Sequence, residues 1–173
     1  MANKISAIQK ARLQQELIEH KEEAKNAQER MVIAKEEGDF SENSGLDASR
    51  DMLNLHTSRA KEITEILENS EVVGASSGPI IDIGSLIRLE KFDATAKSFI
   101  SLGLFLLDST AGFGILETES PIGRTIKGNP SGISWVQTSL GETNQYRYQK
   151  DNSEKAMQEF LQAYPADLKL FGE

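Results

Sequence analysis

The sequence contains no cysteine, which excludes disulfide bonds, thiol chemistry and cysteine-ligated metal centres. It also lacks any run of about 18 apolar residues, the length that a membrane-spanning helix needs. Its first residues, Met-Ala-Asn-Lys-Ile-Ser, do not form the apolar stretch of a signal peptide. These absences fit a cytoplasmic protein that has no membrane partner.

Common enzyme signatures are missing as well. The chain has no Gly-rich phosphate loop, no His-Glu-x-x-His and no Gly-x-Ser-x-Gly. Its two histidines both fall on a helical seam, which argues against a Ser-His-Asp arrangement. The net charge of -8 argues against binding nucleic acid through its phosphates, because that affinity comes from Lys and Arg.

The first half of the sequence has a long helical pattern. Residues 5–37 contain neither Pro nor Gly, and apolar or small residues recur there in steps of three and four, as they do again in residues 46–67. The two seams are Leu13, Leu17, His20, Ala24, Ala27, Met31, Ala34 and Leu46, Ser49, Leu53, His56, Ala60, Ile63, Leu67. Two such helices joined by a short turn predict an antiparallel hairpin about 45 Å long.

Folding the chain about Phe40 predicts that Leu13 lies near Leu67 and Leu17 near Ile63, with each histidine beside alanines. A metal-binding or pH-sensing role is conceivable for His20 and His56, one on each helix. The pattern favours the simpler interpretation, in which both are half-buried seam residues.

The second half of the chain has a different pattern. Ser76-Ser77-Gly78-Pro79 is typical of a linker. Strands are predicted over residues 80–90, 97–107, 113–118, 131–138 and 143–149, with a short helix over 120–128 and another over 152–163. The expected fold is therefore α+β, with a helical hairpin at 1–75, a linker at 76–80, a small domain at 81–150 and a C-terminal extension at 151–173.

The turn between the two helices, residues 38–44, concentrates the polar chemistry. Asp39 and Glu42 flank Phe40, the one large apolar residue of the turn. Carboxylates on a turn suit a hard dication such as Mg²⁺, although two exposed carboxylates alone hold it weakly. On residue types alone, a solvated acidic turn explains the same residues.

Three motifs in this order resemble the bacterial transcript cleavage factors of the Gre family. The turn, Gly38-Asp39-Phe40-Ser41-Glu42-Asn43, is similar to the family's tip, and Leu13-Gln14-Gln15-Glu16-Leu17 resembles its Leu-x-x-Glu-Leu. Ser120-Pro121-Ile122-Gly123-Arg124 resembles its C-terminal signature, and Gly84-Ser85-Leu86-Ile87-Arg88-Leu89 resembles the first strand of that domain.

The resemblance implies a coiled-coil hairpin followed by an FKBP-like domain, in a monomer that binds RNA polymerase. The hairpin would pass down the secondary channel, where Asp39 and Glu42 help the polymerase hold Mg²⁺, supported by Phe40, Ser41 and Asn43. The polymerase, not this protein, would then cleave the RNA, whose 3′ end the factor reaches indirectly. The docking segment would be Glu119, Ser120, Pro121, Ile122, Gly123 and Arg124.

Two departures from the family leave alternatives open. The tip continues Asn43-Ser44-Gly45-Leu46 where the family usually has Asn-Ala-Glu-Tyr, so one acid and one aromatic ring are lost. About 23 residues follow Lys150, where the family usually ends, and these suggest an added contact or a cap on the small domain. A Gre-like regulator that occupies the channel without stimulating cleavage is one alternative. A coiled-coil adaptor without a metal role is another.

Overall fold

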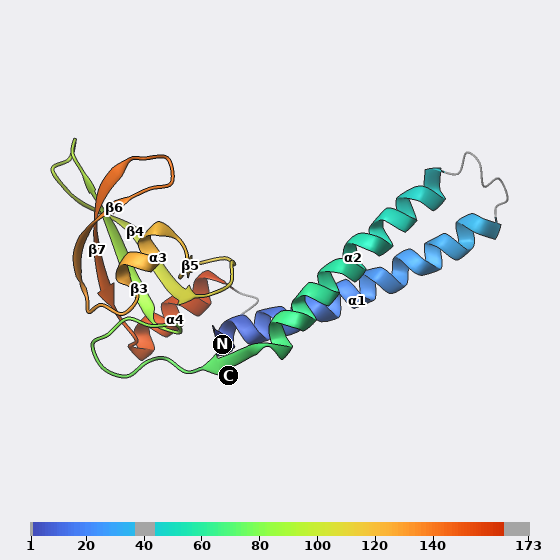
Figure 1. Ribbon diagram of the computed structural model, residues 1–173, viewed down its shortest axis with the longest axis horizontal. Helices are drawn as coiled ribbons and strands as arrows, with labels where there is room; N and C mark the ends of the chain where they lie inside the picture. Colours follow the sequence, from blue (N-terminus) through green and yellow to red (C-terminus); the bar gives the residue numbers. More distant parts are fainter. Residues whose placement is uncertain (1, 37–43, 165–173) are drawn as a thin grey trace. The chain divides into compact units, whose positions relative to one another are not determined.

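The computed structural model describes residues 2–36 and 44–164. Its contacts divide the chain into two compact units. The hairpin unit is Ala11–Ser70, and the C-terminal unit is Met1–Lys10 together with Glu71–Glu173. Figure 1 labels their helices and strands. No helix in the described ranges is long and apolar enough to cross a bilayer.

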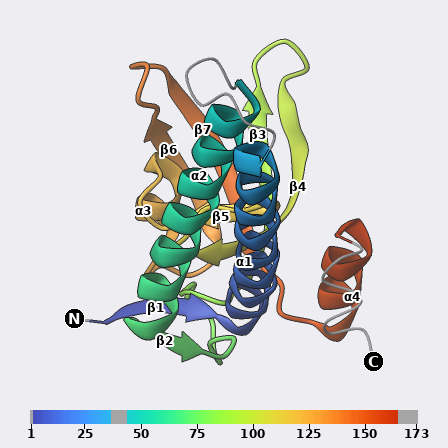
Figure 2. The same ribbon diagram turned by 90° about the vertical axis from the view of Figure 1, so that its right-hand side faces the viewer.

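The hairpin unit is built from α1 (Ala7–Glu36) and α2 (Ser44–Glu68), which lie side by side in Figure 2. Every residue of the two predicted seams is buried or half-buried, with Leu13, Ala27, Ala34, Leu46 and Ile63 the most buried. The 30 residues of α1 correspond to about 45 Å of helix. The predicted antiparallel helical hairpin is confirmed.

The pairing of the helices differs from the predicted one by about one helical turn. His20 lies opposite His56, with 2.8 Å between their Nδ1 atoms, instead of facing only alanines. Arg59 reaches Glu16 across the same seam, at 2.9 Å. A shift of four residues keeps the same side of each helix facing inward, so the periodicity alone permits both pairings.

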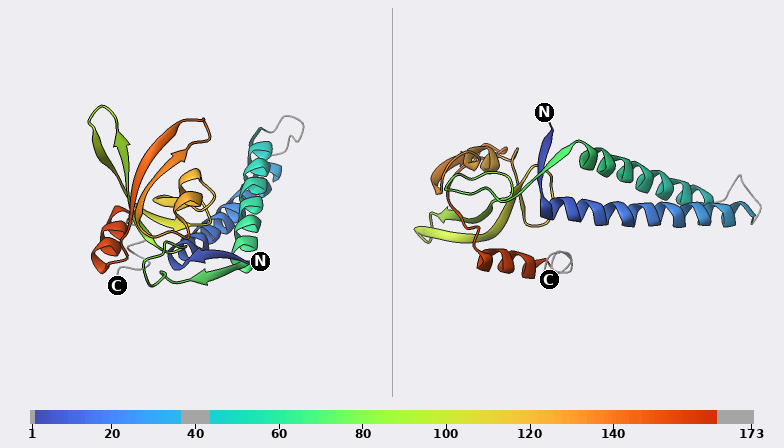
Figure 3. Two further views of the ribbon diagram at one scale, coloured as in Figure 1. Left: turned by 60° about the vertical axis from the view of Figure 1, so that its left-hand side comes forward. Right: turned by 90° about the horizontal axis from the view of Figure 1, so that it is seen from below.

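The C-terminal unit contains a five-stranded sheet in the order β5-β4-β3-β7-β6. Its neighbours are antiparallel except β4 and β5. The strands are β3 (Leu86–Asp93), β4 (Ser98–Asp108), β5 (Ile115–Glu117), β6 (Gly132–Gln137) and β7 (Thr143–Lys150). All five predicted strands are present, and the left view of Figure 3 shows the sheet bending around α3.

The first predicted strand begins six residues later than expected. Residues 81–85 make a turn instead, in which Ser85 N donates to the Asp82 carbonyl at 2.9 Å. Gly84 has a φ of 86°, in the left-handed region that residues with a Cβ rarely adopt. Ile81 and Ile83 are nevertheless buried, which explains why this stretch has the apolar pattern of a strand.

Two helices cover the sheet with separate apolar clusters. The short helix α3 (Pro121–Ile126) contributes Ile126 to a core with Ile81, Ile87, Leu89, Leu107, Leu116, Val136, Tyr146 and Tyr148. The helix α4 (Glu154–Ala163) contributes Ala156, Phe160 and Leu161 to a second core with Ile8, Leu86 and Leu106. The extension therefore buries apolar surface against one end of the sheet, which stabilises the unit.

The N-terminal residues join the C-terminal unit through contacts that the sequence pattern did not indicate. β1 (Asn3–Ser6) pairs with β2 (Ser70–Val73) in a two-stranded sheet. Ser6 N donates to the buried carboxylate of Asp108 at 2.8 Å. Gln9, which is only 2% exposed, donates from Nε2 to Thr110 Oγ1 at 2.6 Å. The first turn of α1 is thus anchored in this unit.

Replacing Gln9 with alanine is expected to lower the free energy of unfolding of the C-terminal unit by about 1–3 kcal/mol. The substitution removes a buried amide and leaves the groups that accepted its hydrogen bonds without that donor. Gln15→Ala is the matched control, since Gln15 is exposed and its side chain donates to the exposed side chain of Glu19. It should change stability by less than about 0.5 kcal/mol. Urea denaturation followed by near-ultraviolet circular dichroism measures both. Equal effects of the two substitutions would contradict the anchoring role of Gln9.

Candidate functional site

The predicted tip residues Asp39, Phe40, Ser41, Glu42 and Asn43 lie outside the described residues. The structure describes the two helix ends beside them. The described part of α1 extends to Glu36, and α2 is described from Ser44. The described parts of the two helices therefore flank the tip motif in the sequence.

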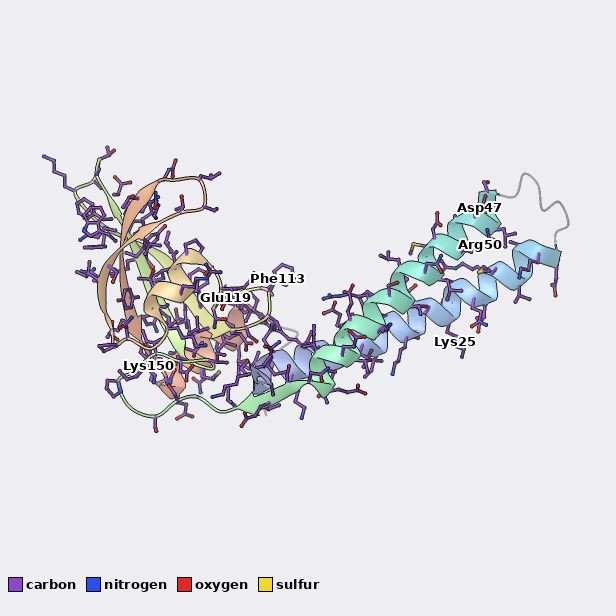
Figure 4. All side chains as sticks on the ribbon, viewed as in Figure 1. Lys25, Asp47, Arg50, Phe113, Glu119 and Lys150 are labelled. Carbon is purple, nitrogen blue, oxygen red and sulfur yellow. The ribbon has the colours of Figure 1, made fainter. Side chains whose placement is uncertain are left out.

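The start of α2 is anchored by an apolar contact and carries acidic side chains in solvent. Leu46 is 4% exposed, which confirms its predicted place on the seam. Asp47 lies 3.5 Å from Arg50 in an ion pair that leaves both side chains more than half exposed. Figure 4 shows both at the free end of α2. An exposed pair of this kind contributes little to stability, so this end of the hairpin remains acidic and hydrated.

Within the described ranges, no group of three or more His, Asp or Glu side chains is arranged to hold a metal ion. The described helix ends supply only exposed, separate carboxylates such as Glu36, Asp47 and Asp51. Oxygen donors of this type match Mg²⁺ chemically, but a complete site needs further ligands.

The predicted docking segment forms the start of α3. Ser120 caps this helix, because its Oγ accepts from Gly123 N at 3.0 Å and donates to the Glu117 carbonyl at 2.7 Å. Pro121 occupies the first turn, where its missing N–H costs nothing. Ile122 packs against the first core cluster. A turn followed by a short helix was predicted here, and the structure has it.

Gly123 is required by the backbone that surrounds it. A Cβ at this position would lie 1.9 Å from the Glu117 carbonyl oxygen, well inside any permitted contact. Ser120, Pro121, Ile122 and Gly123 therefore have structural explanations. Glu119 and Arg124 differ, because they form a 3.1 Å ion pair whose side chains are 74% and 69% exposed. These two charged residues and Pro121 are the exposed residues of this segment, so a partner can meet them.

Phe113 is an exposed aromatic residue, although the sequence pattern predicts it at the start of a strand. It precedes β5 instead, and it is 83% exposed. Figure 4 labels it together with Glu119, which follows β5. The signal in the sequence was an aromatic residue between Gly112 and Gly114, two turn-forming residues that keep it out of the sheet.

A groove of about 600 Å³ lies in the C-terminal unit. It is lined by Arg88, Glu90, Ser101, Gly103, Ser131, Gly132, Ile133, Arg147, Tyr148, Gln149, Lys150 and Glu159. The basic groups of this lining already have partners. Arg88 binds Asp151 and Glu159, Arg147 binds Glu90, and Lys150 Nζ donates to the carbonyls of Ser76, Gly78 and Ile80 at 2.7–2.9 Å.

These pairs also explain the shifted acidities in the groove. The hydroxyl of Ser153 and the guanidinium of Arg88 both donate to Asp151, and they hold the pKa of its carboxyl below its ordinary value. Hydrogen bonding to Arg88 lowers the pKa of Glu159 in the same way. Because Arg88 and Arg147 are paired with carboxylates and the Nζ donors of Lys150 are taken up by backbone carbonyls, the groove is a poor site for an anionic ligand.

The comparison with known proteins agrees with the three motifs. A family model described as "Transcription elongation factor, N-terminal", for GreA and GreB, matches residues 3–72. Transcription elongation factor GreA of Mycoplasmopsis pulmonis is 32% identical over 130 residues, which cover 69% of this chain and 82% of that protein. GreA of Desulfovibrio desulfuricans is 30% identical over 123 residues, with 69% and 75% covered.

Further relatives have lower identity. GreA of Listeria welshimeri is 28% identical over 140 residues, covering 78% of this chain and 86% of that protein. Among solved structures, GreA factor homolog 1 (Gfh1) of Thermus thermophilus is 21% identical, with 86% and 97% of the two chains covered and a TM-score of 0.42. On the sequence matches, this chain belongs to the GreA/GreB family of transcription elongation factors.

Proposed function

We propose that this protein binds RNA polymerase and stimulates the polymerase's own Mg²⁺-dependent cleavage of backtracked transcripts. The observation that carries the proposal is the tip motif Gly38-Asp39-Phe40-Ser41-Glu42-Asn43 between the ends of two long helices. A thin hairpin about 45 Å long can carry two carboxylates into a channel of another protein.

In this proposal Asp39 and Glu42 complete a metal site that the polymerase supplies in part. Their oxygens suit Mg²⁺, and the free protein should hold that ion only weakly. When bound between the two proteins, Mg²⁺ activates water and neutralises the charge that develops on the phosphate. Phe40, Ser41 and Asn43 would support these two carboxylates. Because the factor would lend ligands to the polymerase's own reaction, it would be a cofactor protein and not itself an enzyme.

A second function has a specific observation in its favour. Beyond Asp39 and Glu42, the tip lacks one further acid and the tyrosine that the family usually has. Leu46, which stands in the tyrosine position, is buried in the seam. Leucine packs but cannot donate a hydrogen bond to a partner, whereas tyrosine does both. A channel-binding regulator that modulates the polymerase without stimulating cleavage fits these residues.

The decisive experiment adds the protein to stalled, backtracked elongation complexes at several Mg²⁺ concentrations. Shortening of the transcript from its 3′ end supports the proposed function. Inhibition of elongation without shortening at every Mg²⁺ level overturns it in favour of the regulator. Absence of any effect or binding contradicts both.

Docking through Glu119 and Arg124 can be tested by reversing both charges. The double variant Glu119→Lys with Arg124→Glu keeps the ion pair, so folding should be preserved, while a partner meets the opposite charges. We expect at least a tenfold loss of polymerase affinity, a free-energy change of about 1.4 kcal/mol. Glu142→Lys, which changes an exposed acid in the β6–β7 turn, is the control. Unchanged affinity of the folded double variant would move the contact elsewhere.

A further inference from the structure

The strand β6 forms one edge of the five-stranded sheet in the C-terminal unit. Two of its side chains are used by the fold, because the Ser134 hydroxyl lies 2.9 Å from the Tyr148 hydroxyl and Val136 belongs to the first core cluster. Ile133 and Trp135 point to the opposite face of the sheet, where they are 51% and 66% exposed. The fold therefore explains only alternate residues of β6.

The backbone of β6 is also paired on one side only. Just beyond the strand, Thr138 N donates to the Glu142 carbonyl at 2.7 Å. Because N–H groups alternate in direction along an antiparallel strand, the even-numbered residues of β6 direct theirs at β7. The odd-numbered residues, Ile133, Trp135 and Gln137, direct their N–H and carbonyl groups away from the sheet. Among the described residues, no strand pairs with that side of β6.

The other edges of this sheet are protected, and β6 is not. β5 is only three residues long and ends on the charged Glu117. β4 carries a bulge where it extends beyond β5, since Leu102 is an extra residue between the partners of Leu89 and Glu90. Short strands, charges and bulges all prevent foreign strands from adding to an edge. β6 has six residues in unbroken register, with no charged side chain and no proline.

The sheet surface beside β6 suits apolar side chains. Arg147 is the register partner of Ile133, and its guanidinium lies 4.5 Å from the centre of the Phe99 ring. The same guanidinium is paired with the Glu90 carboxylate. Phe92 meets Phe99 edge to face, with 5.4 Å between the ring centres. The side chains of a strand added to β6 would thus lie beside aromatic rings and a cation that already has its counter-ion.

Docking through the exposed pair of Glu119 and Arg124 alone would leave the C-terminal unit weakly held, because exposed charges mainly direct association. The largest contributions to protein interfaces come from aromatic residues that become buried, tryptophan above all. Trp135 is the only tryptophan of the chain. A second copy of the chain is a poorer occupant of β6, because a six-residue strand pair buries less than the about 1,000 Å² that a specific interface needs. A polymerase adds its other contacts to that area.

We propose that β6 is a docking edge, to which RNA polymerase adds an extended segment with apolar side chains at alternate positions. The backbone of that segment pairs with Ile133, Trp135 and Gln137, and the side chains of Ile133 and Trp135 are the anchors. The inference rests on the proposed binding to RNA polymerase, and it adds a second contact to that of Glu119 and Arg124.

The test compares the RNA polymerase affinity of the full chain with that of variants in β6. Trp135→Thr keeps a side chain that favours strands but removes the ring, and it should lower affinity at least tenfold. Gln137→Pro removes an N–H that β7 does not use, and it should lower affinity severalfold, whereas Gln137→Ala should not. Leu140→Thr, at an 88% exposed position in the β6–β7 turn, is the matched control and should change affinity less than twofold.

Hydrogen–deuterium exchange measures strand addition without any variant. In the free chain the amides of Ile133, Trp135 and Gln137 should exchange quickly, and those of Ser134 and Val136 slowly. Bound polymerase should slow the first set at least tenfold, because these amides then donate to the added strand.

The outcomes separate this inference from the proposed function. If the parent protein binds polymerase and stimulates cleavage, while folded Trp135→Thr and Gln137→Pro bind equally well, β6 is not a docking edge. Unchanged exchange of β6 in the complex would overturn the inference too. If the parent protein does not bind polymerase, the proposed function fails and this inference fails with it. A dimer of the parent protein that Trp135→Thr abolishes, with polymerase affinity unchanged, would assign the edge to a second copy instead.

Discussion

Replacing Asp39 or Glu42 with alanine is expected to reduce stimulated transcript cleavage on the order of 100-fold, the scale at which single groups that stabilise a transition state contribute. Each substitution removes one oxygen donor that the proposed function assigns to the shared Mg²⁺ site. The sequence predicts a polar turn around both residues, so stability should change by less than about 0.5 kcal/mol. The measurement is the cleavage rate of a backtracked complex at a saturating concentration of each variant.

The control for the loss of negative charge is Asp51→Ala, because Asp51 is an exposed acid on the first turns of α2 that has no assigned metal role. It should cleave like the parent. Polymerase binding is measured for all three variants, so that weak cleavage is not confused with weak association. A bound Asp39 or Glu42 variant that cleaves at the parental rate would remove that residue from the metal site.

Replacing Gly123 with alanine is expected to destabilise the C-terminal unit by about 3 kcal/mol or more. The added Cβ would lie 1.9 Å from the Glu117 carbonyl oxygen and 3.0 Å from Ser120 Oγ. That carbonyl belongs to β5 and also accepts from Ser120, so neither group can move without breaking the cap of α3. A clash with backbone atoms cannot be relieved by rotating a side chain. The loss of stability should therefore lie at the upper end of the range for core substitutions.

The effect should be confined to one unit. Near-ultraviolet circular dichroism reports on Tyr146 and Tyr148 in the core of the C-terminal unit, while the far-ultraviolet signal is dominated by α1 and α2. Gly132→Ala is the control, since its Cβ would meet nothing closer than 3.7 Å. If Gly123→Ala were as stable as this control, the close approach of α3 to β5 would not limit the residue at 123.

Local patterns in the sequence were sufficient for the helices and for the five strands of the large sheet, but not for β1 and β2. The steps of three and four between Leu13 and Ala34 predict which side of α1 is buried, because helical periodicity depends only on neighbours along the chain. The spacing of Ala156 and Phe160 predicts α4 for the same reason, and Ser153 caps it as expected of a short polar residue. The tip and C-terminal motifs also led to the family, which the relatives confirm.

Contacts between distant residues were decided only by the tertiary structure. The periodicity of α1 and α2 permits several pairings one turn apart, so it could not bring His20 to His56. Nor could the sequence around α3 distinguish the roles of its residues. Glu119 and Arg124 face solvent, whereas Gly123 is constrained by the carbonyl of a residue six positions earlier. The burial of Phe160 beside Ile8 and Leu86 joins three remote segments. Such contacts depend on complementary shapes across the fold, and periodicity along one segment carries no information about them.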